Sequence, residues 1–152
     1  LHGVWAEADQ GKDHIWEALR AMISASPAAG AEEWAIHGHE GFEGAGVSES
    51  ASFDAVCALA EFISEHGELG AKVYEHFGND LGDARAAFDE YAGAYTSAAA
   101  FAEQLHEDLG TDIPTSLRYS IDWKSLARDM DLNGDILVFE LGFENVHIFW
   151  AR

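Results

Sequence analysis

The strongest chemical pattern in the sequence is a run of oxygen-bearing side chains in its C-terminal third. Asp129, Asp131 and Asn133 alternate, Gly134 follows, and Glu140 completes the formula of a calcium-binding EF-hand loop. Such a loop surrounds calcium with oxygen ligands and requires a helix that leaves it. Residues 136–140 are strand-like instead, and Leu137 replaces a side chain that usually supplies oxygen. We interpret the pattern as a helix-to-strand turn carrying surface acids, with a single EF-hand-like calcium site as the alternative.

The residues allow two other chemistries, a histidine metal site and acid–base catalysis, and the sequence favours neither. His37 and His39 could place two imidazoles on one face of a strand, as metal sites do, but the spacing offers no third ligand. Carboxylates are so numerous that no pair stands out as a general acid and base. The sequence has no nucleophile motif, glycine-rich phosphate loop or dinucleotide fingerprint. We therefore predict a protein that is not an enzyme and needs neither a metal nor another cofactor.

Negative charge is the property that dominates the whole chain. Its 152 residues contain 28 Asp and Glu against 8 Lys and Arg, a formal net charge of −20, and the acids are spread along the entire sequence. A chain this acidic is often disordered, but 48% of these residues are hydrophobic, which indicates a folded protein with an acidic exterior. Self-repulsion makes such a surface costly, so it needs a reason. Three reasons remain open: general solubility, adaptation to high salt as in a salt-adapted acidic interaction domain, and a surface that is recognised as a polyanion.

The composition also limits the partners and the compartment. A strongly acidic surface repels nucleic acid and anionic membranes, so we expect binding to neither. The single cysteine, Cys57, excludes a disulfide within the chain and fits a reducing cytoplasm, where we place the protein. No apolar stretch approaches the roughly 20 residues that a membrane-spanning helix requires.

The elements that would carry these acids follow from local patterns. In the first third, residues 3–8 and 33–37 read as strands and residues 12–24 as a helix. In the middle third, Phe53, Val56, Ala60 and Ile63 recur at helical spacing, and glycines at 67 and 70 are expected to interrupt the helix. A further helix is predicted to start between Gly78 and Gly82.

The last third alternates helices and strands. We predict a strand near residues 90–95, a helix over 97–109, a short helix opened by Pro114 and a helix over 123–130. Residues 136–140 and 146–150 read as two strands joined by a hairpin loop at 142–145. These patterns predict an α+β fold with two ends that contain both helices and strands, residues 1–46 and 90–152, and a helical middle, residues 47–89.

Several segments together resemble the ArdA-type antirestriction proteins. The segment LARDMDLNGD at 126–135 is similar to the antirestriction motif region of that family, and VHIFW at 146–150 resembles its last strand. Upstream, residues 30–37 with 40–42 resemble its N-terminal region, and residues 60–63 with 65–68 also fit the family. The chain departs from the family after His37, where an acid and a tyrosine are more usual, and at Leu1, before which the family has about one more strand.

The resemblance implies an elongated protein of three domains that forms a homodimer through the C-terminal one. It implies a mimic of bent B-form DNA that occupies the DNA groove of type I restriction-modification enzymes, the methyltransferase core included, and blocks restriction and modification. The residues expected in its antirestriction motif region are Leu126, Arg128, Asp129, Asp131, Asn133, Gly134 and Asp135. The candidates for the dimer interface or its support are Val146, Ile148, Phe149 and Trp150, with the bases Arg118, Lys124, Arg128 and Arg152 neutralising acids there.

Mimicry of DNA requires carboxylates spaced like phosphates. B-DNA carries one negative charge per ~1.7 Å of its axis, whereas acids four residues apart on a helix are ~6 Å apart, so several elements must contribute. We predict that the acids of the mimic surface are Asp54, Glu61, Glu65, Glu68, Glu75, Asp80, Asp83, Glu103, Glu107 and Asp108.

Overall fold

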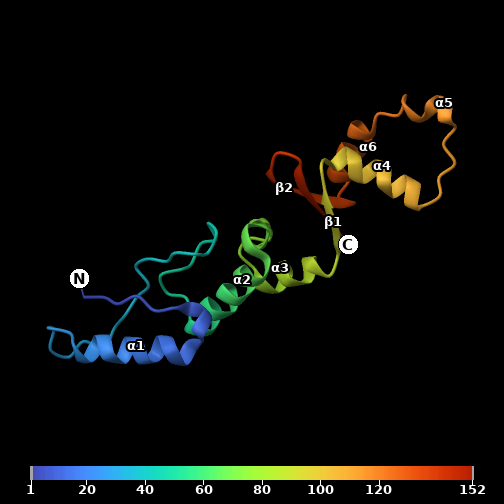
Figure 1. Cartoon of the computed structure of the whole chain (residues 1–152). Coiled ribbons are helices and arrows are strands. Elements are labelled where there is room, and N and C mark those ends of the chain that lie inside the picture. Colours follow the sequence, from blue (N-terminus) through green and yellow to red (C-terminus); the bar gives the residue numbers. More distant parts are fainter. Residues whose placement is uncertain (1, 152) are drawn as a thin grey trace. The chain divides into compact units, whose positions relative to one another are not determined.

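The computed structural model describes residues 2–151, which form an α+β protein (Figure 1). The chain divides into two compact units, unit 1 over Leu1–Leu81 and unit 2 over Gly82–Arg152. The first predicted domain and most of the second fall within unit 1, so the division into three small domains stays a prediction. Within the described residues, no helix is long and apolar enough to cross a membrane.

Unit 1 is built on two helices and a short 3-10 turn. The turn η1 (Ala8–Gln10) leads into α1 (Lys12–Ser24), whose bounds are those predicted from the spacing of its apolar residues. The long helix α2 (Phe53–His76) begins at Ser52, whose hydroxyl accepts a hydrogen bond of 3.2 Å from the backbone N–H of Ala55. This cap satisfies one of the amide groups that a helix start leaves without a partner.

The apolar stripe predicted for α2 forms the core of unit 1. Phe53, Val56, Ala60 and Ile63 are all buried, and Phe62 is 1% exposed. The ring of Phe53 stacks on Trp34 at a centroid distance of 4.3 Å and meets the edge of Trp16 at 4.9 Å. Aromatic packing therefore fixes the long loop before α2 to the two helices.

The two strands predicted for unit 1 are not formed, and this part of the prediction is wrong. Residues 3–8 are irregular up to η1, and residues 33–37 make only one hydrogen bond of ladder type, from Ile36 N–H to the carbonyl of Glu49 at 3.0 Å. An isolated strand is not stable without a partner to pair with. Among the described residues of unit 1 none is supplied, and Trp34 is held by its ring instead.

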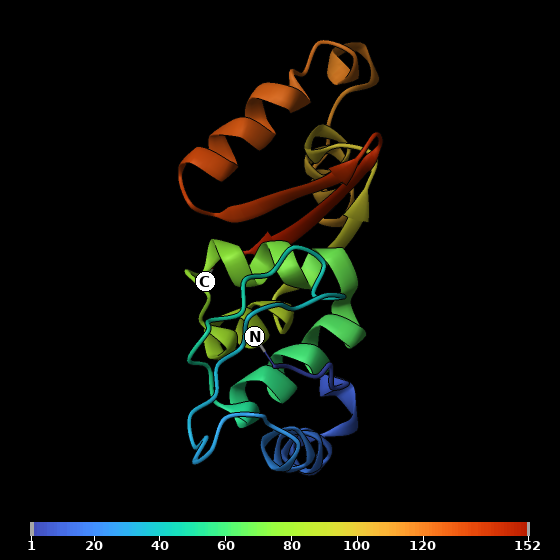
Figure 2. The ribbon, with the colours of Figure 1, turned by 90° about the vertical axis from the view of Figure 1, so that its left-hand side faces the viewer.

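Helix α2 bends at Gly67 into two arms. Gly67 has φ 58° and ψ −143°, a conformation outside the helical region that only glycine adopts readily. Figures 1 and 2 show the arms before and after this residue running in different directions. The predicted interruption at Gly67 is therefore a bend, whereas Gly70 is buried within the second arm and does not interrupt it.

Unit 2 is a three-stranded antiparallel sheet with helices around it. In chain order its elements are α3 (Leu81–Phe88), β1 (Tyr91–Tyr95), α4 (Ala98–Asp108), α5 (Thr115–Arg118), α6 (Trp123–Leu132), β2 (Ile136–Gly142) and β3 (Asn145–Trp150). The boundary between the two units follows Leu81, the first residue of α3. The strand order is β1-β3-β2, which places the last strand in the centre. The predicted hairpin is confirmed, since β2 and β3 pair from Ile136–Trp150 to Gly142–Asn145.

A different group of apolar side chains packs on each face of this sheet. On one face Val146 and Ile148 form a cluster with Phe101 of α4 and Ile136, against which Met130 of α6 packs. Figure 2 shows α6 and the sheet as separate layers of unit 2.

The opposite face is built around the ring of Phe149. That ring lies 5.1 Å from Phe88, 5.0 Å from Tyr91 and 5.5 Å from Phe139, measured between ring centroids. Alternate residues of β3 therefore serve two different parts of the core.

Candidate functional site

The five acids predicted on α2 all lie on its exposed side. They are Asp54, Glu61, Glu65, Glu68 and Glu75. The buried stripe of Phe53, Val56 and Ile63 occupies the other side, so the helix separates an apolar from an acidic face. Because Gly67 stands between Glu65 and Glu68, the bend divides these acids between two arms that point in different directions.

In the folded protein, a base from another helix lies beside the first acid of the α2 stripe. Lys12 of α1 lies with its Nζ 3.0 Å from Oδ1 of Asp54. The hydrogen bond and the charge of Asp54 raise the pKa of Lys12 above its usual value. The acidic stripe itself contains no base, but α1 neutralises its first member. Only the tertiary fold brings these two side chains together, so no signal in the sequence could have identified the pair.

Two predicted acids lie where α2 gives way to α3. Asp80 is exposed in the connection between the helices, and Asp83 is exposed in the first turn of α3. An acid in the first turn of a helix is stabilised by the partial positive charge of the free amide groups there. Burial and, second, the charge of Asp80 raise the pKa of Tyr74.

Three predicted acids lie on α4 in unit 2. Glu103 is half-buried, whereas Glu107 and Asp108 are exposed. Glu107 forms an ion pair with Arg118 of α5, and Gln104 donates a hydrogen bond of 2.9 Å from Nε2 to Oδ1 of Asp108. As at Asp54, a base distant in the sequence neutralises one acid of the predicted surface.

The predicted antirestriction motif region forms α6 and the turn that ends it. Asp122 caps the helix, accepting hydrogen bonds from the backbone N–H and the hydroxyl of Ser125 at 2.9 and 2.8 Å. These hydrogen bonds lower the pKa of Asp122. Arg128, Asp129 and Asp131 are exposed on α6 and Leu126 is half-buried.

The Asn133-Gly134 turn is a helix C-cap of the Schellman type. Gly134 has φ 76°, its N–H donates to the carbonyl of Asp131 at 3.0 Å, and the N–H of Asp135 donates to the carbonyl of Met130 at 2.9 Å. A strand, β2, then begins at Ile136. This confirms the helix-to-strand turn, and an EF-hand geometry, which needs a second helix here, is not formed.

The histidine pair is not organised as a metal site. Nδ1 of His37 lies 3.8 Å from Oε1 of Glu49, and the ring of His39 meets the edge of Phe42. Among residues 2–151, no three His, Cys, Asp or Glu side chains are grouped closely enough to hold a metal ion. The strand that was expected to align the two imidazoles is absent, which removes the basis of that alternative.

The dimer candidates on β3 belong to the interior of unit 2. Ile148 and Phe149 are 0% exposed and Val146 is 4% exposed, while Trp150 is half-buried. β3 also pairs with a strand on each side, so its buried side chains contribute to the core beneath the surface of unit 2. Arg152 lies outside the described residues.

All charge in the described residues is at or near the surface, because none of their polar or charged side chains is buried. The acids therefore keep their hydration, and their sum creates a negative field around the protein. Nine of the ten predicted acids are exposed and one is half-buried. The arrangement suits ionic binding to a cationic partner.

The family model described as "Antirestriction protein (ArdA)" matches residues 1–145. The chain belongs to the ArdA antirestriction protein family. The match includes α6 and its Schellman turn and ends where β3 begins, at Asn145. No curated protein matches the chain in a sequence search. Membership of the ArdA family assigns the chain to the antirestriction proteins, and it suggests an interaction with restriction-modification enzymes.

Proposed function

We propose that the protein inhibits type I restriction-modification enzymes by occupying their DNA-binding groove as a mimic of bent B-form DNA. The observation that carries this proposal is the exposure of nine of the ten predicted acids on a chain of net charge −20 that belongs to an antirestriction family. Proteins bind DNA largely by pairing cations with phosphates and releasing counterions. A folded polyanion competes for the same cations, whatever the recognition sequence.

In this proposal the protein acts without catalysis, cofactor or metal, in the cytoplasm where restriction enzymes meet DNA. Both cleavage and modification are blocked, because both require the methyltransferase core to hold DNA. The elongated arrangement of three small domains, 1–46, 47–89 and 90–152, is part of the proposal. It would spread the acids over a length that a single helix does not reach.

Displacement of a labelled DNA duplex from a purified type I methyltransferase core tests the proposal. Wild-type protein should displace DNA, and its affinity should fall on the order of 10³-fold or more between 50 and 200 mM salt if six or more ion pairs form. Affinity that does not change with salt would contradict the mimic. A protein adapted to high salt would instead unfold as salt is removed.

The distribution of charge gives a second test. Glu61→Gln or Glu65→Gln alone should change inhibition little, because exposed ion pairs contribute about 0.2–1 kcal/mol each. Neutralising Asp54, Glu61, Glu65 and Glu68 together should weaken it clearly and lower the slope of log affinity against log salt. A large loss from one substitution would indicate a localised site.

We further propose that the active form is a symmetric homodimer assembled through the C-terminal region. Lys124 and Arg128 support this, because they lie exposed one turn apart on α6 of an otherwise acidic chain. They would face acids of the second copy, while β3 supports the surface from within. Dimerisation should strengthen with added salt, which screens the repulsion of two acidic chains. Sedimentation of a Lys124→Glu/Arg128→Glu variant should show weaker association.

A further inference from the structure

The tip of the β2–β3 hairpin presents an aromatic ring to solvent. Gly142 pairs with Asn145, so Phe143 and Glu144 alone form the turn, and Phe143 is 93% exposed. The hairpin below is firmly held, since Phe139 and Val146 are buried. A side chain at this tip is therefore projected from a rigid base rather than from a mobile loop.

Both turn residues are unfavourable choices for folding. Phenylalanine gains stability from burial and gains none here. Glu144 has φ 52°, in the left-handed region where two-residue hairpin turns normally use glycine, asparagine or aspartate. A residue kept in a strained conformation at the surface points to a role outside the fold.

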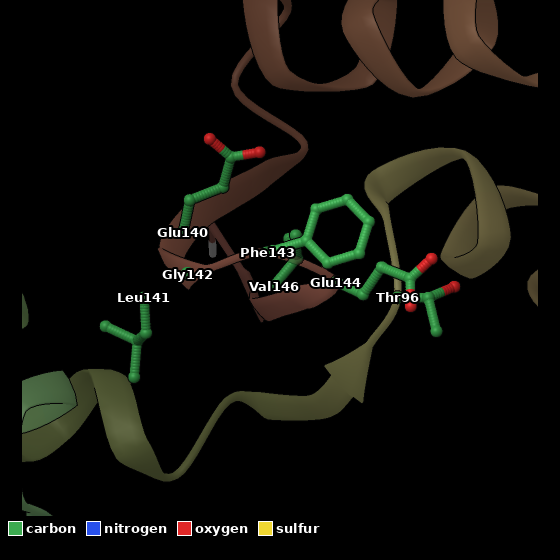
Figure 3. Close-up of a pocket in the computed structure, with 7 residues that line it drawn as sticks. All are labelled: Thr96, Glu140, Leu141, Gly142, Phe143, Glu144 and Val146. Atoms are coloured by element: carbon green, nitrogen blue, oxygen red, sulfur yellow. The ribbon is translucent and has the colours of Figure 1, made fainter.

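Carboxylates accompany the exposed ring. Glu140 and Glu144 line the same open hollow as Phe143, together with Thr96, Leu141, Gly142 and Val146, and the hollow has a volume of about 590 Å³. Figure 3 shows Glu140 and Leu141 leaving the strand on opposite sides, with the Phe143 ring at the tip. A flat ring beside carboxylates shares two features with a nucleotide, an aromatic base and nearby anionic phosphates.

Enzymes that modify a base inside a duplex turn it out of the stack into a pocket lined with aromatic and apolar side chains. The extruded base stays attached to its backbone, so the base pocket must lie close to the groups that hold the neighbouring phosphates. We propose that Phe143 enters the base pocket of the methyltransferase in place of the extruded base, while Glu144 lies against cations that otherwise hold its phosphates. This inference rests on the proposed function and names the part of the enzyme that the hairpin meets.

The first experiment compares Phe143→Ala with wild-type protein in the DNA displacement assay. We expect inhibition to weaken at least tenfold with an unchanged salt slope, because no charge is removed. Tyr119→Ala is the matched control, since Tyr119 is an aromatic side chain of the same unit that is 94% exposed, and it should inhibit like wild type. Equal inhibition by Phe143→Ala and wild type would overturn the inference but leave the proposed function intact. Failure of wild type to displace DNA would remove both.

Two further measurements separate the base pocket from other contacts. Glu144→Gly should raise the melting temperature by relieving strain and still weaken inhibition; unchanged inhibition would count against a role for the carboxylate. A photoreactive benzoylphenylalanine at position 143 should crosslink to the peptides that line the base pocket of the catalytic subunit. Crosslinks to the specificity subunit, or to a second copy of this chain, would overturn the assignment.

Discussion

Replacing Gly67 by alanine is expected to destabilise unit 1 by about 1–3 kcal/mol while leaving the bend of α2 in place. The cost comes from the backbone alone. Gly67 has φ 58° and ψ −143°, which an L-residue adopts only under strain, while a Cβ added there would meet no atom within 4 Å. No side chain has to move to accommodate the methyl group.

The variant could avoid this strain only by straightening α2. The free energy gained by straightening is smaller than the cost of exposing the buried side chains of the second arm. Alanine in a helix is favoured over glycine by about 1 kcal/mol, so straightening would gain roughly 2–4 kcal/mol in total. It would also redirect the second arm, whose residues Leu69 and Val73 are 8% and 0% exposed. Exposing both side chains costs about 3–6 kcal/mol. Burial therefore holds the bend.

Thermal unfolding followed by circular dichroism measures the loss of stability in Gly67→Ala. Each kcal/mol of lost stability should lower the melting temperature of a unit of this size by roughly 4–8 °C. Gly78→Ala is the matched control: Gly78 also has positive φ, 64°, and open space around it, but lies beyond the end of α2. Spin labels at positions 55 and 76, in a chain with Cys57 replaced, report the bend, because a straight helix would separate these positions by about 32 Å. A melting temperature above wild type, with a separation near that value, would refute the reasoning.

Three other predictions follow from single contacts. Ile148→Asp should unfold unit 2 rather than yield a folded monomer, because the side chain is 0% exposed; Leu132→Asp, at a position 71% exposed, should not, and near-ultraviolet circular dichroism separates the two. Lys12→Gln should barely change stability yet tighten binding to the methyltransferase at low salt by releasing Asp54 from its ion pair, a gain that Asp54→Asn in the same background should abolish. Burial lowers the pKa of the His147 imidazole below its usual value of about 6.5. As the pH falls, this imidazole is therefore protonated more readily in the unfolded chain than in the folded one, and the free energy of unfolding should decrease below about pH 6.5. The urea midpoint of wild type should therefore decline more than that of His147→Gln between pH 7.5 and 5.5; parallel declines would contradict the assignment.

Local signals predicted the elements that depend on local interactions. Helix α1 has the predicted bounds because its apolar spacing and the residues around it agree. The turn at Asn133-Gly134 and the hairpin after Glu140 followed from turn chemistry and from β-branched residues. In each case a few neighbouring residues carry most of the energy that decides the conformation.

Features that depend on distant partners could not be predicted. Residues 33–37 alternate like a strand, but a strand requires a neighbour, and the ring of Trp34 packs on Phe53 instead. The acidic stripe was recognised on α2, whereas the pairing of Asp54 with Lys12 and of Glu107 with Arg118 arises only when helices meet. The acidic face of α2 and the interruption at Gly67 were thus predictable, whereas the local neutralisation of Asp54 and Glu107 was not.

The central place of β3 has a consequence for how the protein is made. Strands β1 and β2 each pair with β3 and not with each other. A chain leaving the ribosome exposes β1, α4, α6 and β2 before the strand that joins them has been synthesised. Unit 1 has all of its residues available earlier and can fold during translation. The sheet of unit 2 must wait for β3, so a nascent chain stalled shortly before Asn145 would carry a folded N-terminal unit and an unpaired, protease-sensitive remainder.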